Sequence, residues 1–138
     1  MAYDTILYEV RERICTITLN RPEHMNSYNS QMCQEINLAL DAADSDDDVR
    51  VVIFTGAEGG KRPAYCAGFD LTVDKPFDFS EAGFHNTRDT GGTNALRIYA
   101  MRKPVLAAIN GSAVGIGITM TLPMDMRIFG NDGRIGGL

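Results

Sequence analysis

The chain has 138 residues, enough for one domain with a hydrophobic core of its own. Its 44% hydrophobic and 22% charged residues exclude the disordered and fibrous classes. The formal net charge of -5 disfavours nucleic acid as a partner, although an anionic small molecule could still meet local cations. These cations are Arg21, Lys61, Arg62 and Lys103.

Cysteine usage and the N-terminus bear on location. Cys15, Cys33 and Cys66 are an odd number without CxxC spacing, which favours neither a disulfide framework nor a zinc site. The first ten residues, "MAYDTILYEV", carry acidic residues where a signal peptide is basic, and no run of 18 apolar residues occurs. We therefore expect a cytoplasmic protein without a metal or a membrane partner.

The chain opens with two β-rich runs, "ILYEV" (6–10) and "ICTITLN" (14–20), which predict two strands joined by a tight turn. Cys15, Ile17 and Leu19 share one face of the second strand. The following "RPEHMNSYN" predicts a loop that ends in a helix N-cap at Asn29 or Ser30.

An amphipathic helix is predicted from residue 32, because apolar residues recur there at helical spacing. They are Met32, Ile36, Ala39, Leu40 and Ala43. We interpret the acidic run "DSDDD" (44–48) as a solvated loop, since no glycine-centred calcium-loop pattern accompanies it.

The run "VRVVIFTG" (49–56) is continuously apolar and β-branched, which predicts a strand buried on both faces. The order strand, helix, strand predicts a right-handed crossover. The irregular segment "AEGGKRPAYCAGFDL" (57–71) then follows the carboxyl end of a buried strand, where open α/β folds usually bind ligands.

The polar segment 72–93 carries Phe77, Phe79 and Phe84 and is interpreted as mobile or ordered by a ligand. A short helix "NALRIYAMR" (94–102) and a buried strand in "KPVLAAING" (103–111) follow. "SAVGIGITMTLPM" (112–124) is expected to be helical in its later part, and "DMRIFG" (125–130) to be a strand. No linker is evident, so we predict a single domain over residues 1–138.

Glycine-bearing turns follow two of these predicted strands, "CAGFDL" (66–71) and "AVGIGIT" (113–119). Glycine lets the backbone approach a ligand, and unpaired N–H groups at a helix start can stabilise a developing oxyanion. The alternative is that these glycines only permit close packing. Neither the GxGxxG fingerprint nor the GxxxxGK[ST] phosphate loop is present, so the sequence gives no specific support for NAD or ATP.

Four segments in order, "LNRPEHMNSYNSQM", "DDDVRVVIFTGA", "YCAGFDL" and "RKPVLAAINGSAVGIGITMTLPMDMRI", resemble the enoyl-CoA hydratase/isomerase (crotonase) superfamily. The resemblance covers the N-terminal half of that family's core. It implies an α/β fold, a crotonase-like spiral of ββα turns of the ClpP/crotonase type, truncated at residue 138. It also implies an acyl-CoA substrate, no tightly bound cofactor beyond the coenzyme A of the substrate, and a homo-oligomer, a trimer or hexamer.

By the same resemblance, the backbone N–H groups of Phe69 and Ile116 are expected to hold the thioester oxygen. The residues expected to bind the substrate are Met25, Asn26, Ser27, Ala67, Gly68, Asp70, Leu71, Gly115, Gly117 and Thr119. Asp70 has a competing structural interpretation as a helix cap, because its carboxylate would repel the phosphates of CoA.

Hydratases of this family carry a glutamate where this chain has Thr119, and a hydroxyl is too weak a base to replace it. Relatives that shift double bonds manage with one carboxylate, commonly in a region that would follow residue 138. Glu81 and His85 could alternatively reach the acyl group, but solvent exposure is the simpler interpretation of a lone histidine, and we assign neither residue to catalysis.

Two functions are therefore expected. The first is an acyl-CoA enzyme that stabilises a thioester enolate, with isomerisation favoured over hydration. The second is a catalytically silent or truncated crotonase-like protein that binds acyl-CoA or serves in assembly.

Overall fold

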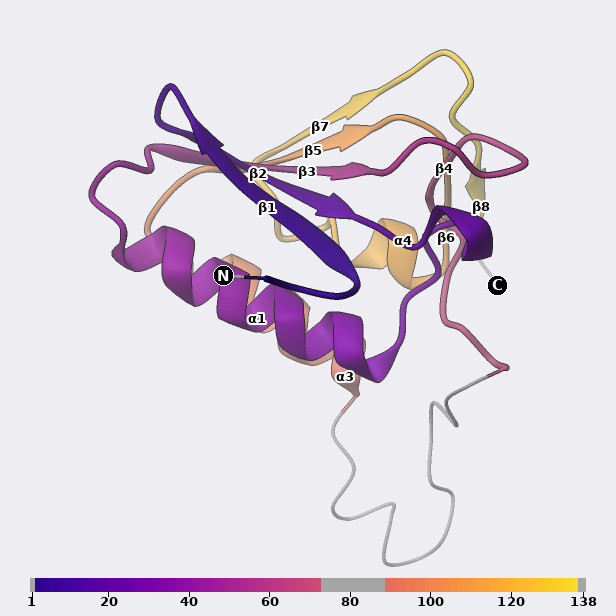
Figure 1. The fold of residues 1–138 in the computed structure, drawn as a ribbon, viewed down its shortest axis with the longest axis horizontal. Helices are drawn as coiled ribbons and strands as arrows, with labels where there is room; N and C mark the ends of the chain where they lie inside the picture. Colours follow the sequence, from indigo (N-terminus) through magenta and orange to yellow (C-terminus); the bar gives the residue numbers. More distant parts are fainter. Residues whose placement is uncertain (1, 73–88, 137–138) are drawn as a thin grey trace, which may run out of the picture.

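The computed structural model describes residues 2–72 and 89–136 (Figure 1). The residues named from the polar segment, Phe77, Phe79, Glu81, Phe84 and His85, lie outside the described residues, so the expectations for them are untested.

The first two strands form a hairpin, as predicted. β1 (Ile6–Arg11) pairs antiparallel with β2 (Ile14–Leu19). Glu12 and Arg13 both have positive φ, 51° and 68°, which a two-residue turn needs to match the twist of its strands. The predicted inner face of β2 is confirmed, because Cys15, Ile17 and Leu19 are fully buried.

A short 3-10 helix, η1 (Pro22–His24), leads to helix α1 (Ser30–Ser45). Of the two predicted caps the structure uses Asn29, whose Oδ1 accepts a hydrogen bond from the Met32 N–H at 2.8 Å. The predicted apolar stripe is confirmed: its five members are all buried beneath the sheet, namely Met32, Ile36, Ala39, Leu40 and Ala43.

Parallel strands extend the hairpin into a five-stranded sheet. β2 pairs with β3 (Val51–Gly56), β3 with β5 (Val105–Ile109) and β5 with β7 (Met126–Phe129), so the order is β1-β2-β3-β5-β7. β2 and β3, which α1 connects, pair in parallel, as a crossover connection requires.

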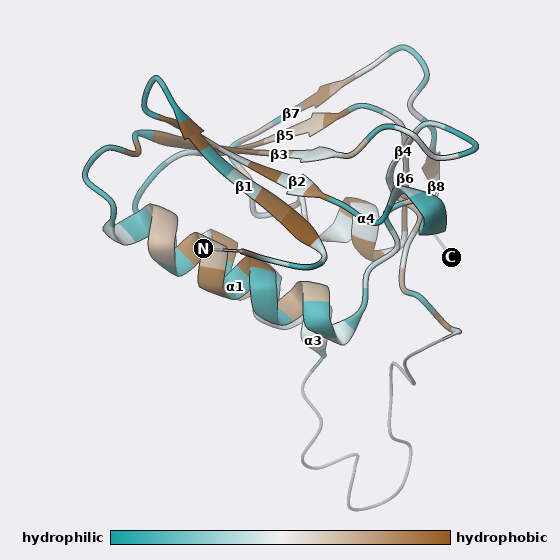
Figure 2. Cartoon of the chain, in the orientation of Figure 1, coloured by the Kyte–Doolittle hydropathy of each residue, from teal (hydrophilic) through white to brown (hydrophobic). Residues whose placement is uncertain are grey.

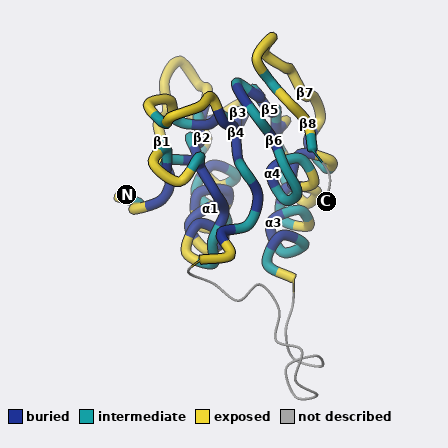
Figure 3. Tube along the Cα trace, turned by 90° about the vertical axis from the view of Figure 1, so that its right-hand side faces the viewer, coloured by how far each residue is buried: buried dark blue, intermediate teal, exposed yellow. Residues whose placement is uncertain are grey.

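The prediction that β3 is buried on both faces is wrong. Val52 and Phe54 are fully buried, whereas Val51 and Ile53 on the other face are only half-buried. The physical reason is that α1 and α3 both cover the same face of the sheet (Figure 1). The tube in Figure 3 shows the resulting buried layer between the sheet and the two helices.

Helix α3 (Thr90–Tyr99) begins four residues earlier than the predicted "NALRIYAMR". The carboxylate of Asp89 caps it by accepting hydrogen bonds from the N–H groups of Gly91 and Gly92. Asp44 at the start of the acidic run is part of α1 and pairs with Arg97 of α3, so this residue joins the two helices instead of lying in a loop.

A second, three-stranded sheet of order β4-β6-β8 was not predicted. Its strands are β4 (Ala64–Cys66), β6 (Ser112–Val114) and β8 (Ile135–Gly136), all parallel. These strands have two or three residues each and lie near glycines in the sequence, so they are too short to show alternating apolar and polar residues. Helix α4 (Ile116–Thr119) is a single turn, shorter than the helix expected there.

The edge strand β7 has all four of its residues exposed, and three of them are apolar: Met126, Ile128 and Phe129. Figure 2 shows this hydrophobic strand at the border of the sheet. None of the helices in the described part of the chain is long and apolar enough to cross a membrane.

Candidate active site

The two glycine-bearing turns lie side by side because the strands that lead into them pair in parallel. Cys66 at the end of β4 is in register with Ala113 of β6. Phe69 follows Cys66 by three residues, and Ile116 follows Ala113 by three. The turns therefore leave the same edge of the small sheet, and not the large sheet as the sequence suggested.

Direct contacts between the turns require glycine. A methyl group on Gly117 would overlap the carbonyl oxygen of Cys66, and one on Gly68 would lie 3.3 Å from the carbonyl oxygen of Val114. Gly68 also has a φ of +102°, which side-chain-bearing residues rarely adopt. The packing interpretation of these glycines is thus correct, and it is compatible with a ligand role.

Gly115 differs from its neighbours. Its φ of +54° and ψ of -120° suit only glycine, yet a methyl group added to it would meet nothing within 4 Å. The backbone at Gly115 therefore faces open space at the start of α4.

The two predicted donors are not used within the described part of the chain. No described residue accepts a hydrogen bond from the N–H of Phe69 or Ile116. Gly68 and Asp70 both bond to the backbone of Tyr28, through Tyr28 N–H to Gly68 oxygen (2.8 Å) and Asp70 N–H to Tyr28 oxygen (2.7 Å). Because alternate backbone groups of an extended segment point to opposite sides, the Phe69 N–H points away from Tyr28.

The side chains of the two donors are held by neighbours. The ring of Phe69 packs on that of Tyr28, with 5.8 Å between centroids and 55° between planes. Ile116 packs its Cδ1 against Gly91 at the start of α3, so closely that a methyl group on Gly91 would overlap it. A phenylalanine and an isoleucine can therefore occupy these positions while offering only their backbone.

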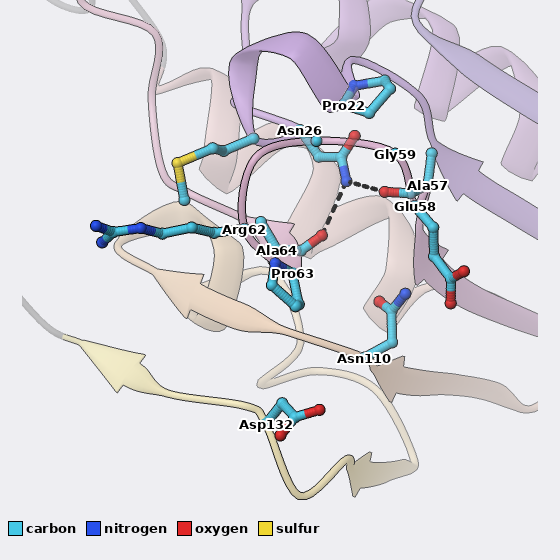
Figure 4. Close-up of a pocket in the computed structure, with 12 residues that line it drawn as sticks. Pro22, Asn26, Ala57, Glu58, Gly59, Arg62, Pro63, Ala64, Asn110 and Asp132 are labelled. Carbon is cyan, nitrogen blue, oxygen red and sulfur yellow. Dashed lines mark hydrogen bonds between the residues drawn. The ribbon is translucent and has the colours of Figure 1, made fainter.

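The loop of Met25, Asn26 and Ser27 is hydrogen-bonded to the turn of residues 66–71, so these two groups of expected substrate-binding residues lie next to each other. The Ala67 N–H donates to the Met25 carbonyl oxygen at 3.1 Å. The Asn26 carboxamide is wholly engaged. Its Nδ2 donates to the carbonyl oxygens of Ala57 and Ala64, both at 2.9 Å (Figure 4). Its Oδ1 accepts from the Arg21 N–H.

Asp70 is the acceptor of a buried ion pair. Its Oδ2 lies 2.9 Å from Arg21 Nη2, and its Oδ1 accepts from the Thr72 hydroxyl and N–H. The Thr72 hydroxyl bond and the Arg21 contact lower the pKa of Asp70 to about 2. Asp70 therefore has a structural role as the partner of Arg21 and Thr72, whereas its predicted role as a helix cap stays untested. The N–H bond to Thr72 has the form of a cap, but the residues beyond it are not described.

Of the remaining expected residues, Leu71 and Thr119 are exposed at the ends of the two turns. The Thr119 N–H donates to the Gly115 carbonyl oxygen at 3.0 Å, which closes the single turn of α4. Its side chain makes no hydrogen bond to any described residue, so nothing in the described structure fixes the hydroxyl for acid or base work.

A pocket of about 260 Å³ lies beside this region, between the Met25 loop and residues 57–64 (Figure 4). Neither Phe69 nor Ile116 lines it. Arg62 shares its wall with the carboxylates of Glu58 and Asp132, so the pocket is not a cluster of cations suited to phosphate.

Two of the four cations suggested for an anionic ligand are already engaged. Arg21 pairs with Asp70, and Lys103 Nζ donates to the carbonyl oxygens of Ala43 and Asp46. Lys61 and Arg62 are exposed, and neither makes an ion pair with any described residue.

Cysteine and metal chemistry have little support in the described residues. Cys15, Cys33 and Cys66 are free and buried, and desolvation raises the pKa of Cys15 and of Cys66 to about 11, which keeps these two as neutral thiols. No group of three His, Cys, Asp or Glu residues within 2–72 and 89–136 is placed to hold a metal ion.

The fold places the chain among the crotonase-type α/β proteins. An enoyl-CoA hydratase/isomerase of Xanthobacter autotrophicus superposes with a TM-score of 0.82 at 32% identity, over 99% of this chain and 49% of the other. An enoyl-CoA hydratase/carnithine racemase of Magnetospirillum magneticum superposes with a TM-score of 0.85 at 27% identity, over 99% and 50%.

Sequence comparison gives the family. Residues 9–137 match the enoyl-CoA hydratase/isomerase model, and the chain belongs to this family. Enoyl-CoA hydratase AFT3-1 of Alternaria alternata is 45% identical over 126 residues, 88% of this chain and 39% of the relative. The probable enoyl-CoA hydratase echA8 of Mycobacterium bovis is 33% identical over 136 residues, which are 99% of this chain and 50% of that relative. The chain thus spans about half the length of these relatives or less.

Sequence reasoning missed the residues that support the turns. Tyr28 lies more than 60 residues before Gly91 and Asn94 of α3, and meets that helix only in the folded structure. Arg21 was noted as a cation for a ligand, because nothing local shows that its partner lies 49 residues away. The position of Tyr28, directly after the Met25 loop, was the single signal available.

Proposed function

We propose that the protein acts on an acyl-CoA thioester and stabilises its enolate, with the carbonyl oxygen held between the N–H groups of Phe69 and Ile116. The observation that carries the proposal is that both N–H groups lack an acceptor among the described residues, on turns packed against each other. Two such donors stabilise the negative oxygen more than the neutral carbonyl, which lowers the barrier to proton removal.

Double-bond isomerisation is favoured over hydration in this proposal. A base takes the α-proton of a 3-enoyl thioester, the electron pair moves onto the held oxygen, and the proton returns at the γ-carbon as the 2-enoyl thioester forms. This needs one carboxylate. Hydration by two carboxylates would need an acid or base where Thr119 stands. Asp70 cannot be the base, because it is ion-paired and its pKa is about 2.

The second candidate is an acyl-CoA-binding or assembly protein without turnover. Thr119 favours it, because its exposed hydroxyl leaves the turn without an ionisable group. The exposed apolar residues of β7 also favour it, since such an edge is suited to association.

The proposal extends to the molecule as a whole. It has a single crotonase-like domain, a homo-oligomeric state of trimer or hexamer, and a cytoplasmic location. It uses no tightly bound cofactor, since coenzyme A arrives as part of the substrate.

The test is a pair of assays on the purified protein at high concentration. One supplies crotonyl-CoA and the other a 3-enoyl-CoA, and the absorbance of the conjugated thioester is followed in each. The proposal expects conjugation to appear from the 3-enoyl-CoA faster than it is lost from crotonyl-CoA. CoA-ester binding without turnover of either would support the second candidate, and absence of binding would contradict both.

A further inference from the structure

We propose that Tyr28 and Asn94 are positioning residues that hold the Phe69 turn in register with the Ile116 turn, so that both N–H groups meet one oxygen atom. The inference rests on the function proposed above, and adds to it a set of side chains that touch neither the substrate nor the reacting atoms.

Tyr28 contacts the turn that carries Phe69 through both its backbone and its ring. The bonds from Tyr28 N–H to Gly68 and from Asp70 N–H to Tyr28 fix the residues on either side of Phe69. The ring of Tyr28 lies against that of Phe69 and is fully buried. Any displacement of Tyr28 therefore displaces the Phe69 N–H.

The hydroxyl of Tyr28 is in turn anchored to α3. It donates to Oδ1 of Asn94 and lies 3.2 Å from the Thr90 carbonyl oxygen. Asn94 is itself fully buried, and its Nδ2 donates to the Cys33 carbonyl oxygen at 3.0 Å and to Asn37 Oδ1 at 2.8 Å. These two donor bonds leave Oδ1 as the atom that faces Tyr28.

The same helix supports the second turn. Gly91, one turn before Asn94 on α3, is in contact with Cδ1 of Ile116. A continuous path of contacts thus runs from Phe69 through Tyr28 and Asn94 to α3, and from α3 to Ile116. The direct contact of Gly117 with Cys66 closes the loop at the backbone.

The Tyr28 hydroxyl is the donor, and Asn94 Oδ1 the acceptor, in the hydrogen bond that joins them. Burial raises the pKa of the Tyr28 hydroxyl, so it keeps its proton and acts as a donor at all physiological pH values. Replacing Tyr28 by phenylalanine would leave Oδ1 of Asn94 buried without its donor, which favours rearrangement of α3 against the first turn.

Tyr28→Phe is the main test, because it keeps the ring that packs on Phe69 and removes a single oxygen. Asn94→Ala removes the acceptor, and the double variant tests whether the two act as a unit. Thr5→Val is the matched control. It also removes a buried hydroxyl, which donates to Glu35 Oε2 at 2.5 Å in the first half of α1. The side chain of Glu35 bonds to Asp4, Thr5 and Gln31 and to neither turn.

Two readouts separate positioning from loss of stability. The first is the split between kcat and KM with the 3-enoyl-CoA. The second is the absorption of a bound chromophoric 3-arylacryloyl-CoA thioester, which moves to longer wavelength when its carbonyl oxygen accepts strong hydrogen bonds. Misplacing a donor costs up to about a hundredfold in rate. We expect Tyr28→Phe to lower kcat about tenfold or more, with KM changed less than about threefold, and to reduce the wavelength shift.

The double variant should lose no more than Asn94→Ala alone, and Thr5→Val should keep the parent's kcat and wavelength shift. A parent protein that shifts the probe while Tyr28→Phe and Asn94→Ala shift it equally, with unchanged kcat, overturns the inference and leaves the proposed function intact. A parent that binds the probe without any shift overturns the proposed function itself, and the inference with it.

Discussion

Nη2 of Arg21 donates to Oδ2 of Asp70 across 2.9 Å, and this buried ion pair joins the loop before η1 to the turn that carries Phe69. Arg21 Nη1 also donates to the carbonyl oxygen and hydroxyl of Ser27, at 2.7 and 3.1 Å. One guanidinium thereby fixes two of the residues that the family resemblance assigns to substrate binding, Ser27 in the loop and Asp70 in the turn.

Asp70→Asn should destabilise the protein strongly. The amide keeps the shape of the carboxylate but leaves the charge of Arg21 buried without its partner, which costs on the order of 3 kcal/mol. Urea unfolding followed by circular dichroism gives the difference in the free energy of unfolding. Asp41→Asn is the control, since Asp41 is largely exposed in its pair with Arg97 and should cost under about 1 kcal/mol. Equal losses in the two variants would contradict the role given to the buried pair.

The acid sensitivity of the fold should depend on Asp70. Hydrogen bonding by Thr72 and Arg21 depresses its pKa from 3.8 to about 2 in the folded state. A depressed pKa stabilises the fold at pH values above the unfolded pKa, and this stability is lost as the pH falls from about 4 towards 2. The loss amounts to about 2 kcal/mol and should be absent from Asp70→Asn. Acid titration of the free energy of unfolding in both proteins checks this, and identical slopes would refute it.

Ile116→Pro should remove one of the two donors. Proline is tolerated at the first position of a helix, where its missing N–H has no partner in the helix, so the fold should persist. Loss of a comparable donor costs about 3 to 4 kcal/mol, or 10² to 10³ in kcat. Ile116→Ala keeps the N–H and loses only the contact with Gly91, so its kcat should be well above that of the proline variant. Steady-state kinetics gives kcat for both variants, and equal values would contradict the role of the Ile116 N–H as a donor.

Gly117→Ala should separate the two turns, because the added methyl group meets the backbone of Cys66, which has no rotamer to yield. Overpacking of this kind costs about 1 to 3 kcal/mol. Activity should fall with stability, measured by thermal unfolding and initial rates. Gly130→Ala is the matched control, as its methyl group would lie at an ordinary 3.5 Å from the nearest atom, and it should unfold at the parent temperature. A stable, active Gly117→Ala would disprove the close contact.

Thr119→Glu should raise the hydration of crotonyl-CoA relative to isomerisation, because it supplies the carboxylate that the family resemblance places at this position in hydratases. Surface substitution should change stability by under about 0.5 kcal/mol, as Thr119 is exposed. Thr119→Gln has the same shape without the charge and should leave hydration at the parent rate. The ratio of the two initial rates is the measurement, and a ratio unchanged by glutamate would count against the proposed role of this position.

The large sheet and α1 could be predicted from the sequence because their signals are local. The alternation in β2 and the spacing of the α1 stripe each reflect burial on one side of a regular element. The apolar run of β3 predicted the strand, although not its burial on one face only. The second sheet could not be predicted in this way, because β4, β6 and β8 have two or three residues each, too few to show a period.

In the candidate site, too, the features with a local sequence signal could be predicted and the others could not. The two turns could be found because glycine at Gly68 and Gly115 marks backbone that other residues cannot adopt. Their supports could not, because Arg21 and Asp70 or Tyr28 and Asn94 carry no local pattern and are brought together only by the pairing of distant strands and helices. The boundary of α3 was missed for a simpler reason: two glycines in its first turn concealed a start that Asp89 caps.

The account depends above all on the Phe69 and Ile116 N–H groups binding the thioester oxygen, and amide NMR of ¹⁵N-labelled protein tests this directly. Addition of an acyl-CoA thioester should move both amide protons downfield, whereas coenzyme A alone, which lacks the carbonyl group, should leave them near their free positions. Saturating acyl-CoA that moves neither amide, or coenzyme A that moves both equally, would contradict the account.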